Sequence, residues 1–204
     1  MKIFQLTSLI LTLALFSCKK NPIQLEPNLE PAGSLTRTLV FPNQGGLVKL
    51  AHYNEFSKPE TIATKADGRL SIGIIITPKT INSAGDGIVL AIDESHLQNV
   101  LIKDYDYINP SSRIVLTRYT YSYMENSGDI WGSFTDSQTG VQFEGVLHIT
   151  AYDKERKLLS GSYTVMAKGL INDPTIKGIA GPIDPVNQCD LTVSGTFTNL
   201  KIRE

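Results

Sequence analysis

Short runs of alternating apolar and polar residues, separated by turn residues, fill the chain from about residue 45 to its end. Successive side chains of a strand point to opposite faces, so such alternation predicts strands that each bury one face. No stretch has a convincing helical period, although residues 95–103 fit a helical turn as well as a strand. The expected strands are 46–53, 60–65, 70–77, 88–93, 113–124, 129–136, 141–151, 158–168 and 190–202.

Turn residues separate these runs. Asp67-Gly68 predicts a two-residue hairpin. The segments 126–129 and 137–140, which read NSGD and SQTG, predict longer turns. Many strands joined by short connections favour an all-β fold built as an antiparallel meander. We expect this meander to form a lipocalin-like barrel in preference to a flat sandwich.

The alternation is clearest in the last three expected strands, where one row of each is expected to face the core. These rows are Val141, Phe143, Gly145, Leu147, Ile149 and Ala151; then Leu159, Gly161, Tyr163, Val165 and Ala167; then Leu191, Val193, Gly195 and Phe197. Leu200 and Ile202 fall out of phase with the last row. This change of phase predicts a bulge or a strand end near Thr198-Asn199.

A pattern of glycine, hydroxyl residue and aromatic residue occurs three times, as Gly132-Ser133-Phe134, Gly161-Ser162-Tyr163 and Gly195-Thr196-Phe197. A glycine inside a strand leaves a gap and permits bending, and a ring on a neighbouring strand can cover that gap. We interpret the repeat as a device for curvature and packing. The alternative is that the hydroxyl groups contact a ligand.

Three segments near the C-terminus carry a resemblance to a known group of proteins. Residues 145–153 read GVLHITAYD, residues 159–163 read LSGSY, and residues 193–199 read VSGTFTN. Together they resemble the C-terminal part of uncharacterised Bacteroidota lipoproteins. The resemblance implies a cell-envelope β domain on a lipid tether and supplies no catalytic residues.

The N-terminus predicts export and lipidation. Met1-Lys2 is followed by a largely apolar run over residues 3–16, which is too short to span a membrane and has the length of a signal-peptide core. Ser17-Cys18 then resembles the lipobox of bacterial lipoproteins. The resemblance implies cleavage before Cys18 and several acyl chains on its thiol, which would anchor the protein to the outer membrane. The alternative is an ordinary signal peptide, over residues 1–17, with an incidental cysteine.

Residues 18–44 are expected to be a flexible tether, because they contain four prolines and little periodicity. The β domain would then occupy residues 45–204. In some lipoproteins of the resembled group, an acidic run after the lipidated cysteine is linked to surface export. Lys19-Lys20-Asn21-Pro22 has no acidic residue, so the sequence leaves open whether the domain faces the periplasm or the exterior.

Charge and cysteine content narrow the class of function. The 19 basic and 20 acidic residues nearly cancel, which argues against a nucleic-acid partner. Cys18 and Cys189 are the two cysteines. If Cys18 carries lipid, Cys189 has no partner in the chain, and we expect it to be buried as a small apolar residue. The alternative is a reactive thiol.

The sequence lacks the common catalytic and cofactor-binding motifs, including the nucleophile elbow, the phosphate-binding loop and the dinucleotide fingerprint. His52, His96 and His148 are scattered. Glu94 and His96 form an isolated carboxylate–histidine pair, which is a weak signal for a metal or catalytic site. Residues 104–106, which read DYD, lack the pattern of a calcium loop and are expected to be a solvated turn. We therefore expect no catalytic residues, no metal site and no cofactor, and we predict that the protein is not an enzyme.

Two features could contact a ligand. Tyr119, Tyr121 and Tyr123 alternate on one expected strand, and Trp131 lies across the next hairpin. Exposed, this row could stack on a sugar or an apolar ligand; buried, it would be one layer of the core. The long connection over residues 169–188 is either a binding loop or an idle one.

These observations give two functional hypotheses. The first is a non-enzymatic envelope module that binds a ligand or partner (a glycan, a lipid or a protein) through the tyrosine row and the 169–188 loop. The second is a structural or accessory subunit of an outer-membrane assembly that has no small-molecule pocket. Burial discriminates between them: a row that lines a cavity favours the first, and a sealed row with a large exposed apolar patch favours the second.

Overall fold

The computed structural model describes residues 29–54, 59–97, 101–106, 114–136, 141–178, 182 and 184–204. The expected signal peptide and Cys18 lie outside these residues, so cleavage and lipidation stay predictions. Among the described residues, no helix is long and apolar enough to cross a membrane.

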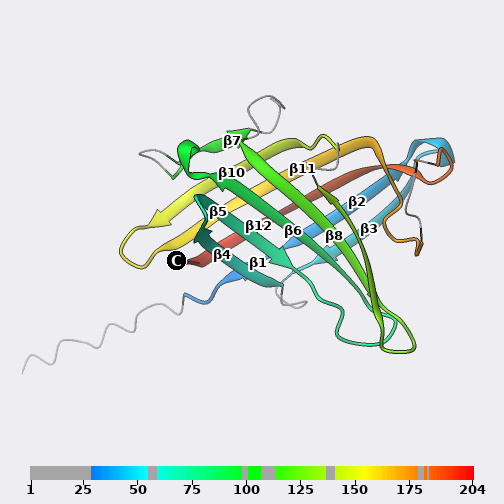
Figure 1. Cartoon of the computed structure of the whole chain (residues 1–204), viewed down its shortest axis with the longest axis horizontal. Helices are drawn as coiled ribbons and strands as arrows, with labels where there is room; N and C mark the ends of the chain where they lie inside the picture. The colour runs from blue at the N-terminus through cyan, green and yellow to red at the C-terminus, as the bar shows by residue number, and fades with distance from the viewer. Residues whose placement is uncertain are drawn as a thin grey trace, which may run out of the picture.

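The described chain is built almost entirely from β-strands (Figure 1). Its only other regular elements in the described ranges are two short 3-10 turns, η1 (Pro42–Gln44) and η2 (Glu94–His96). The strands are β1 (Ala32–Gly33), β2 (Leu35–Phe41), β3 (Leu47–Tyr53), β4 (Glu60–Ala66), β5 (Arg69–Ile75), β6 (Ala84–Asp93), β7 (Asp104–Asp106), β8 (Val115–Met124), β9 (Ile130–Asp136), β10 (Glu144–Asp153), β11 (Leu158–Asn172) and β12 (Gln188–Arg203).

The long strand β12 organises the sheet, because different parts of it pair with different neighbours. One side of β12 pairs with β11, and β10 and β7 follow outward. On its other side, Asp190 to Ser194 pair antiparallel with β2, whereas Ile202 and Arg203 pair parallel with β4. Two arms therefore leave β12: β2 and β3 form one, and β4, β5, β6, β8 and β9 form the other.

The second arm folds across the first, as the strands β5, β6 and β8 show in front of β2 and β12 in Figure 1. The sheet is mostly antiparallel, and it is not closed into a barrel. The all-β class is therefore confirmed. The preference for a closed barrel over a sandwich is wrong, because the two arms end in separate edges instead of pairing with each other.

Residues 35–41 belong to the folded domain and not to the tether. In β2, Leu35, Leu39 and Phe41 are buried, and the strand pairs along its whole length with β3. The expected tether over residues 18–44 is therefore too long at its C-terminal end. Pro31 and Pro42 lie just outside the strand, where proline is compatible with a sheet, so they bound β2 without breaking it.

The expected strands from residue 46 onward all occur, with shifted ends. β6 begins at Ala84, and β11 extends to Asn172, so the long connection shortens to 173–187. Residues 104–106 form β7, which pairs with β10 and buries Tyr105, so the expectation of a solvated turn there is wrong. In the ambiguous segment 95–103, His96 ends the η2 turn.

The core lies between the two arms and contains the rows expected from alternation, including Leu147, Tyr163 and Val193. In β10 the register shifts after Ile149, so Ala151 is exposed and leaves its expected row. The predicted bulge in β12 is confirmed: Leu159 pairs with Leu200 but Gly161 pairs with Phe197, and Asn199 has a φ of 54°. The bulge returns Leu200 and Ile202 to the buried face.

Two copies of the glycine repeat cover each other across the β11–β12 pair. A Cβ added at Gly161 would lie 2.6 Å from the Phe197 ring, and one added at Gly195 would lie 2.7 Å from the Tyr163 hydroxyl oxygen. The aromatic side chain of each copy thus lies over the glycine of the other, through the ring of Phe197 and the hydroxyl of Tyr163, which confirms the packing interpretation for these two copies. The side chain of Phe134, in the third copy, lies outside the described set.

Cys189 is fully buried and forms no disulfide, as expected of a small apolar residue. Burial raises the pKa of its thiol to about 12, and the nearby carboxylates of Asp173 and Asp190 act in the same direction. The thiol therefore stays protonated at neutral pH, which argues against the alternative of a reactive cysteine.

Candidate functional site

The tyrosine row of β8 runs from the sealed core to a partly open end of the sandwich. Tyr119 is fully buried, Tyr121 is 6% exposed, and Tyr123 is half-buried. Trp131 of β9 is the register partner of Tyr123 and is also half-buried. Its ring centroid lies 5.5 Å from that of Tyr121 and 5.9 Å from that of Tyr123. The structure therefore joins Trp131, Tyr121 and Tyr123 into one aromatic cluster, and Tyr119 continues the row into the core.

A buried ion pair completes this cluster. Asp86 of β6 accepts a hydrogen bond from the Tyr119 hydroxyl at 2.5 Å. Arg37 of β2 approaches from the facing arm, with its Nη1 atom 3.7 Å from Asp86 Oδ1. The Arg37 guanidinium also lies over the Tyr121 ring, 5.3 Å from its centroid. The interactions of these residues therefore connect β2, β6 and β8.

Sequence reasoning missed both charged residues. Arg37 lies in the segment that is expected to be the tether, and Asp86 precedes the expected start of its strand at residue 88. A signal was nevertheless present, because Arg37 falls on the apolar row of Leu35, Leu39 and Phe41. A charged residue in such a row either points into a polar interior site or breaks the strand, and the sequence did not decide between these outcomes.

Several polar atoms of this ion pair have no hydrogen-bond partner. Arg37 is 6% exposed and Asp86 is 1% exposed. Within the described structure, Nε and Nη1 of Arg37 and Oδ2 of Asp86 are buried without a hydrogen bond. A buried polar group left in this state costs about 1–3 kcal/mol, and such groups in native proteins usually have a protein, water or ligand partner. The ion pair therefore has the capacity to bind a further polar group.

Burial of Asp86 disfavours its charged form, whereas the polar groups around it favour that form. The pKa of the Asp86 carboxyl is raised above its usual value, because burial outweighs the positive charge of Arg37 and the hydroxyl groups of Tyr119 and Tyr53, which lower it. The pKa of Tyr119 is well above its usual value, because burial and the Asp86 charge both disfavour a phenolate. The two tyrosines are therefore neutral hydrogen-bond donors to Asp86 at neutral pH.

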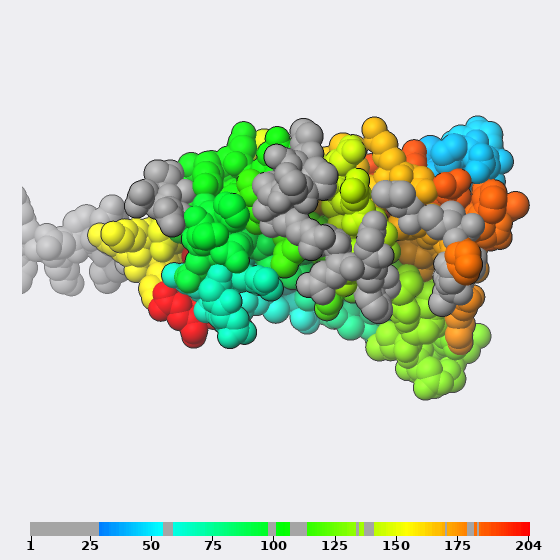
Figure 2. Space-filling view, turned by 45° about the horizontal axis from the view of Figure 1, so that its top comes forward, coloured from blue at the N-terminus to red at the C-terminus, as the bar shows by residue number. Residues whose placement is uncertain are grey.

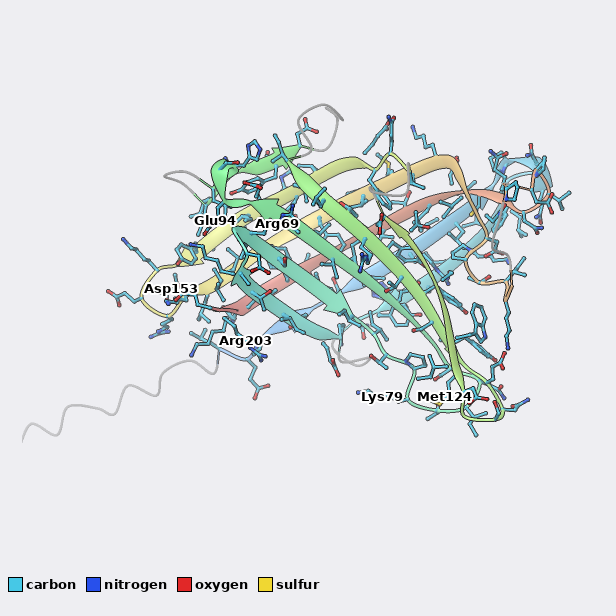
Figure 3. All side chains as sticks on the ribbon, viewed as in Figure 1. Arg69, Lys79, Glu94, Met124, Asp153 and Arg203 are labelled. Atoms are coloured by element: carbon cyan, nitrogen blue, oxygen red, sulfur yellow. The ribbon has the colours of Figure 1, made fainter. Side chains whose placement is uncertain are left out.

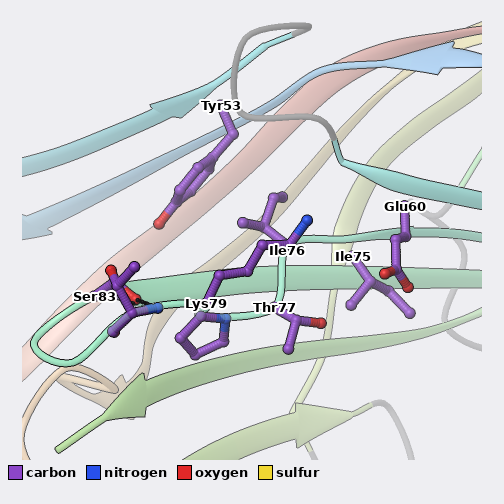
Figure 4. Close-up of a pocket in the computed structure, with 10 residues that line it drawn as sticks. Tyr53, Glu60, Ile75, Ile76, Thr77, Lys79 and Ser83 are labelled. Atoms are coloured by element: carbon purple, nitrogen blue, oxygen red, sulfur yellow. Dashed lines mark hydrogen bonds between the residues drawn. The ribbon is translucent and has the colours of Figure 1, made fainter.

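Tyr53 connects this buried pair to an open cavity of about 220 Å³ (Figure 4). The cavity lies where β3 ends, β4 begins and the chain turns from β5 to β6. In Figure 4 the Tyr53 hydroxyl points toward Ser83, on the far side of the cavity. The polar residues that line the cavity are Tyr53, Glu60, Thr77, Lys79, Thr80 and Ser83.

The location of the cavity is visible on the whole molecule. Lys79, which lines the cavity, lies beside Met124 at the lower right of Figure 3, and Arg69 and Glu94 lie at the opposite end of the same strands. The backbone of Met124 is hydrogen-bonded to Ser83 and Asn82, which ties the β5–β6 connection to the end of β8. The cavity thus opens beside the half-buried end of the tyrosine row.

The first part of the 173–187 connection bridges the two arms. Asp173 is buried and accepts a hydrogen bond from Lys49 of β3 at 2.5 Å. The next residue, Pro174, accepts one through its carbonyl oxygen from Ser133 of β9 at 3.1 Å. Lys177 then pairs with Glu125, in the β8–β9 turn, at 2.6 Å. These contacts hold the connection beside Tyr121 and Trp131, which gives the predicted loop a structural position next to the site.

The other polar candidates do not come together. His148 contacts Asp104 at 2.6 Å, and His52 contacts Thr36 at 2.7 Å. Glu94 pairs with Lys65. In the described ranges, no group of three or more histidine, cysteine, aspartate or glutamate residues could hold a metal ion. The absence of a metal site and of a cofactor stays a prediction.

No family model, no curated protein and no solved structure matches this chain. The resemblance to envelope lipoproteins therefore stays a prediction from the sequence. The geometry around Arg37 and Asp86 is the most specific structural feature from which a function can be argued.

Proposed function

We propose that this protein is a non-enzymatic, lipid-anchored module of the cell envelope that binds a small ligand between the two arms of its sheet. The tyrosine row does not line the cavity, so the proposal does not rest on that row. The observation that carries it is the Arg37–Asp86 pair, which is buried, short of hydrogen-bond partners and separated from the cavity by Tyr53. Lipidation of Cys18 would supply the anchor, and the sequence alone supports that part of the proposal.

The chemistry of the site suggests the kind of ligand. Arg37 has free donors, and Asp86 has a free acceptor. Tyr121 and Trp131 lie beside the ion pair and not in the cavity wall, whereas the ring of Tyr53 does line the cavity and offers a surface on which a sugar could stack. A cavity of about 220 Å³ is smaller than those that hold drug-sized molecules. These features suit a small molecule that bears both a carboxylate and hydroxyl groups, such as an acidic sugar.

Entry to the ion pair requires a movement of Tyr53. Its hydroxyl interacts with the Asp86 carboxyl closely enough to affect the pKa of both groups, and its ring lines the cavity, so it stands between the two spaces. Rotation of this side chain would replace its interaction with Asp86 by a hydrogen bond from the ligand. Exchange of one hydrogen bond for another carries a small net free energy.

A thermal-shift screen tests the proposal. The probes are glucuronate, glucose, a short-chain fatty acid and divalent metal ions, added to the full chain in mild detergent. At a hundredfold excess over its Kd, a ligand stabilises the folded state by about 2.7 kcal/mol. For a chain of this size that corresponds to a rise in Tm of about 5–10 °C.

The matched variants are Thr77→Phe and Thr150→Phe. Thr77 is an exposed residue that lines the cavity, and Thr150 is an exposed residue on β10, far along the sheet. We expect glucuronate to raise the Tm of the wild type and of Thr150→Phe, and to raise that of Thr77→Phe much less. An equal shift in all three proteins, or no shift with any probe, would contradict the proposed function.

A further inference from the structure

The strand β3 is a free edge of the sheet. All seven of its residues pair with β2, and in the described part of the chain it has no partner on its other side. Among the described elements, β3 makes extensive contact only with β2. A free edge presents unpaired backbone N–H and C=O groups, which are a template for a further strand.

This edge carries an unusual amount of exposed apolar surface. Leu47, Val48 and Leu50 are 46%, 55% and 66% exposed. Val186, which is 63% exposed, lies next to them, because Gln44 in the β2–β3 turn donates a hydrogen bond to its carbonyl oxygen. In Figure 2 the blue β2–β3 turn and the orange segment that precedes β12 lie side by side at one end of the molecule.

The usual protections of an edge strand are missing here. Natural proteins blunt their edges with charges, proline or bulges. The edge strand β7 follows this rule, since it has three residues and exposes Asp104 and Asp106. The single charged residue of β3 is Lys49, whose ammonium group is held by Asp173. A long, aliphatic edge strand without these protections is expected to pair with a strand of another molecule.

We propose that two copies of this chain associate through β3, paired antiparallel about a two-fold axis at Leu50. In this register each Lys49 lies opposite Ala51 of the other copy, so no like charges meet. Val48 lies opposite His52, Leu47 opposite Tyr53, and the most exposed residue, Leu50, opposite itself. This register pairs all seven residues of each strand, and two-fold dimers are the commonest form of oligomer.

A second copy suits this edge better than an unrelated strand. In the proposed register no two like charges of the paired β3 strands lie opposite each other. Pairing would also join the two sheets into one continuous sheet and remove Val48 and Leu50 from water. The other long edge, β9, has one large exposed aliphatic residue, Ile130, and carries Asp136, so it is a weaker candidate. The inference does not depend on ligand binding.

A symmetric cross-link tests this register directly. Residues directly opposite in an antiparallel pair have Cα atoms about 4.5–5.5 Å apart, which is within disulfide range. Leu50→Cys is therefore expected to form an intermolecular disulfide in mild oxidant. The full chain would carry Cys18→Ser and be kept in mild detergent, so that the buried Cys189 is its other thiol. Ile130→Cys is the matched control, because Ile130 is 54% exposed on the edge strand β9, against 66% for Leu50 on β3.

Sedimentation measures the association without a cross-link. We expect a dimer for the Cys18→Ser chain and a monomer when Leu50→Lys is added, with the same circular dichroism spectrum for both. The proposal is overturned if the Cys18→Ser chain is a monomer, in which case another protein's strand is the better candidate. It is also overturned if Leu50→Lys stays dimeric, or if Leu50→Cys cross-links no more than Ile130→Cys.

Discussion

At the scale of residues, the most informative feature is a carboxylate that is buried against its chemical preference. Asp86 is almost completely buried, yet its close contacts are one hydroxyl at 2.5 Å and a guanidinium at 3.7 Å. A buried pair of this kind seldom adds net stability relative to an apolar pair. Its presence is therefore better explained by ligand binding than by a contribution to stability.

The hydroxyl of Tyr119 can be tested by a conservative change. Tyr119→Phe removes a hydrogen bond to a buried carboxylate, so we expect the free energy of unfolding to fall by about 1–3 kcal/mol. Tyr123→Phe is the control, because the Tyr123 hydroxyl donates a longer, exposed hydrogen bond of 3.3 Å to Asn82. Loss of that bond should lower the free energy of unfolding by less than about 0.5 kcal/mol. Chemical denaturation measures both values. Equal losses in the two variants would show that the Asp86 contact is not special.

The bridging carboxylate Asp173 predicts a pH dependence. Burial raises its pKa, but hydrogen bonds from Lys49 and Thr175 outweigh burial, and the pKa of the folded protein is lowered. Its ionised form therefore contributes stability above the unfolded pKa of about 3.9, and this contribution is lost as the pH falls through the lower, folded pKa. We expect Asp173→Asn to have a flatter dependence of unfolding free energy on pH below about pH 4 than the wild type. Parallel curves for the two proteins would contradict the assignment.

At the scale of elements, the sequence predicts most strands but not the way in which they end and meet. Alternation located β10, β11 and β12, because one buried face leaves a period of two in the sequence. It missed β2, in which prolines at the ends and a buried Arg37 resemble a polar linker. It also missed β7, whose three residues are held by pairing with β10 and not by their own pattern.

The glycine repeat gives a prediction about strand packing. Gly161→Ala would place a methyl group against the His148 carbonyl oxygen and 2.6 Å from the Phe197 ring. Since overpacking of a core costs about 1–3 kcal/mol or more, we expect a clear fall in Tm or failure to fold. In Gly73→Ala the nearest atoms are 3.8 Å away, so this variant should fold with nearly the wild-type Tm. Similar behaviour of the two variants would argue against the ring-over-glycine packing.

At the scale of the whole molecule, the open sandwich follows from the two sets of partners of β12. Local pattern predicts an antiparallel meander, but whether the meander closes depends on pairings between residues far apart in sequence, such as Ile202 with Ala63. The sequence offers no local signal for these pairings. The same crossing of arms brings Arg37 against Asp86, so the charged half of the site could not be predicted even though its aromatic half was.

The central claim is that a small ligand reaches the space between the arms. Trp131 is the single tryptophan of the chain and lies against Tyr121. The Arg37 guanidinium lies over the same Tyr121 ring, so tryptophan fluorescence reports on the surroundings of the Arg37–Asp86 pair. The most direct test is a titration with glucuronate, followed by tryptophan emission, in the wild type and in Thr77→Phe. The account predicts a saturable change in the wild type and a much weaker one in the variant. Emission that does not respond, or that responds identically in both proteins, would contradict it.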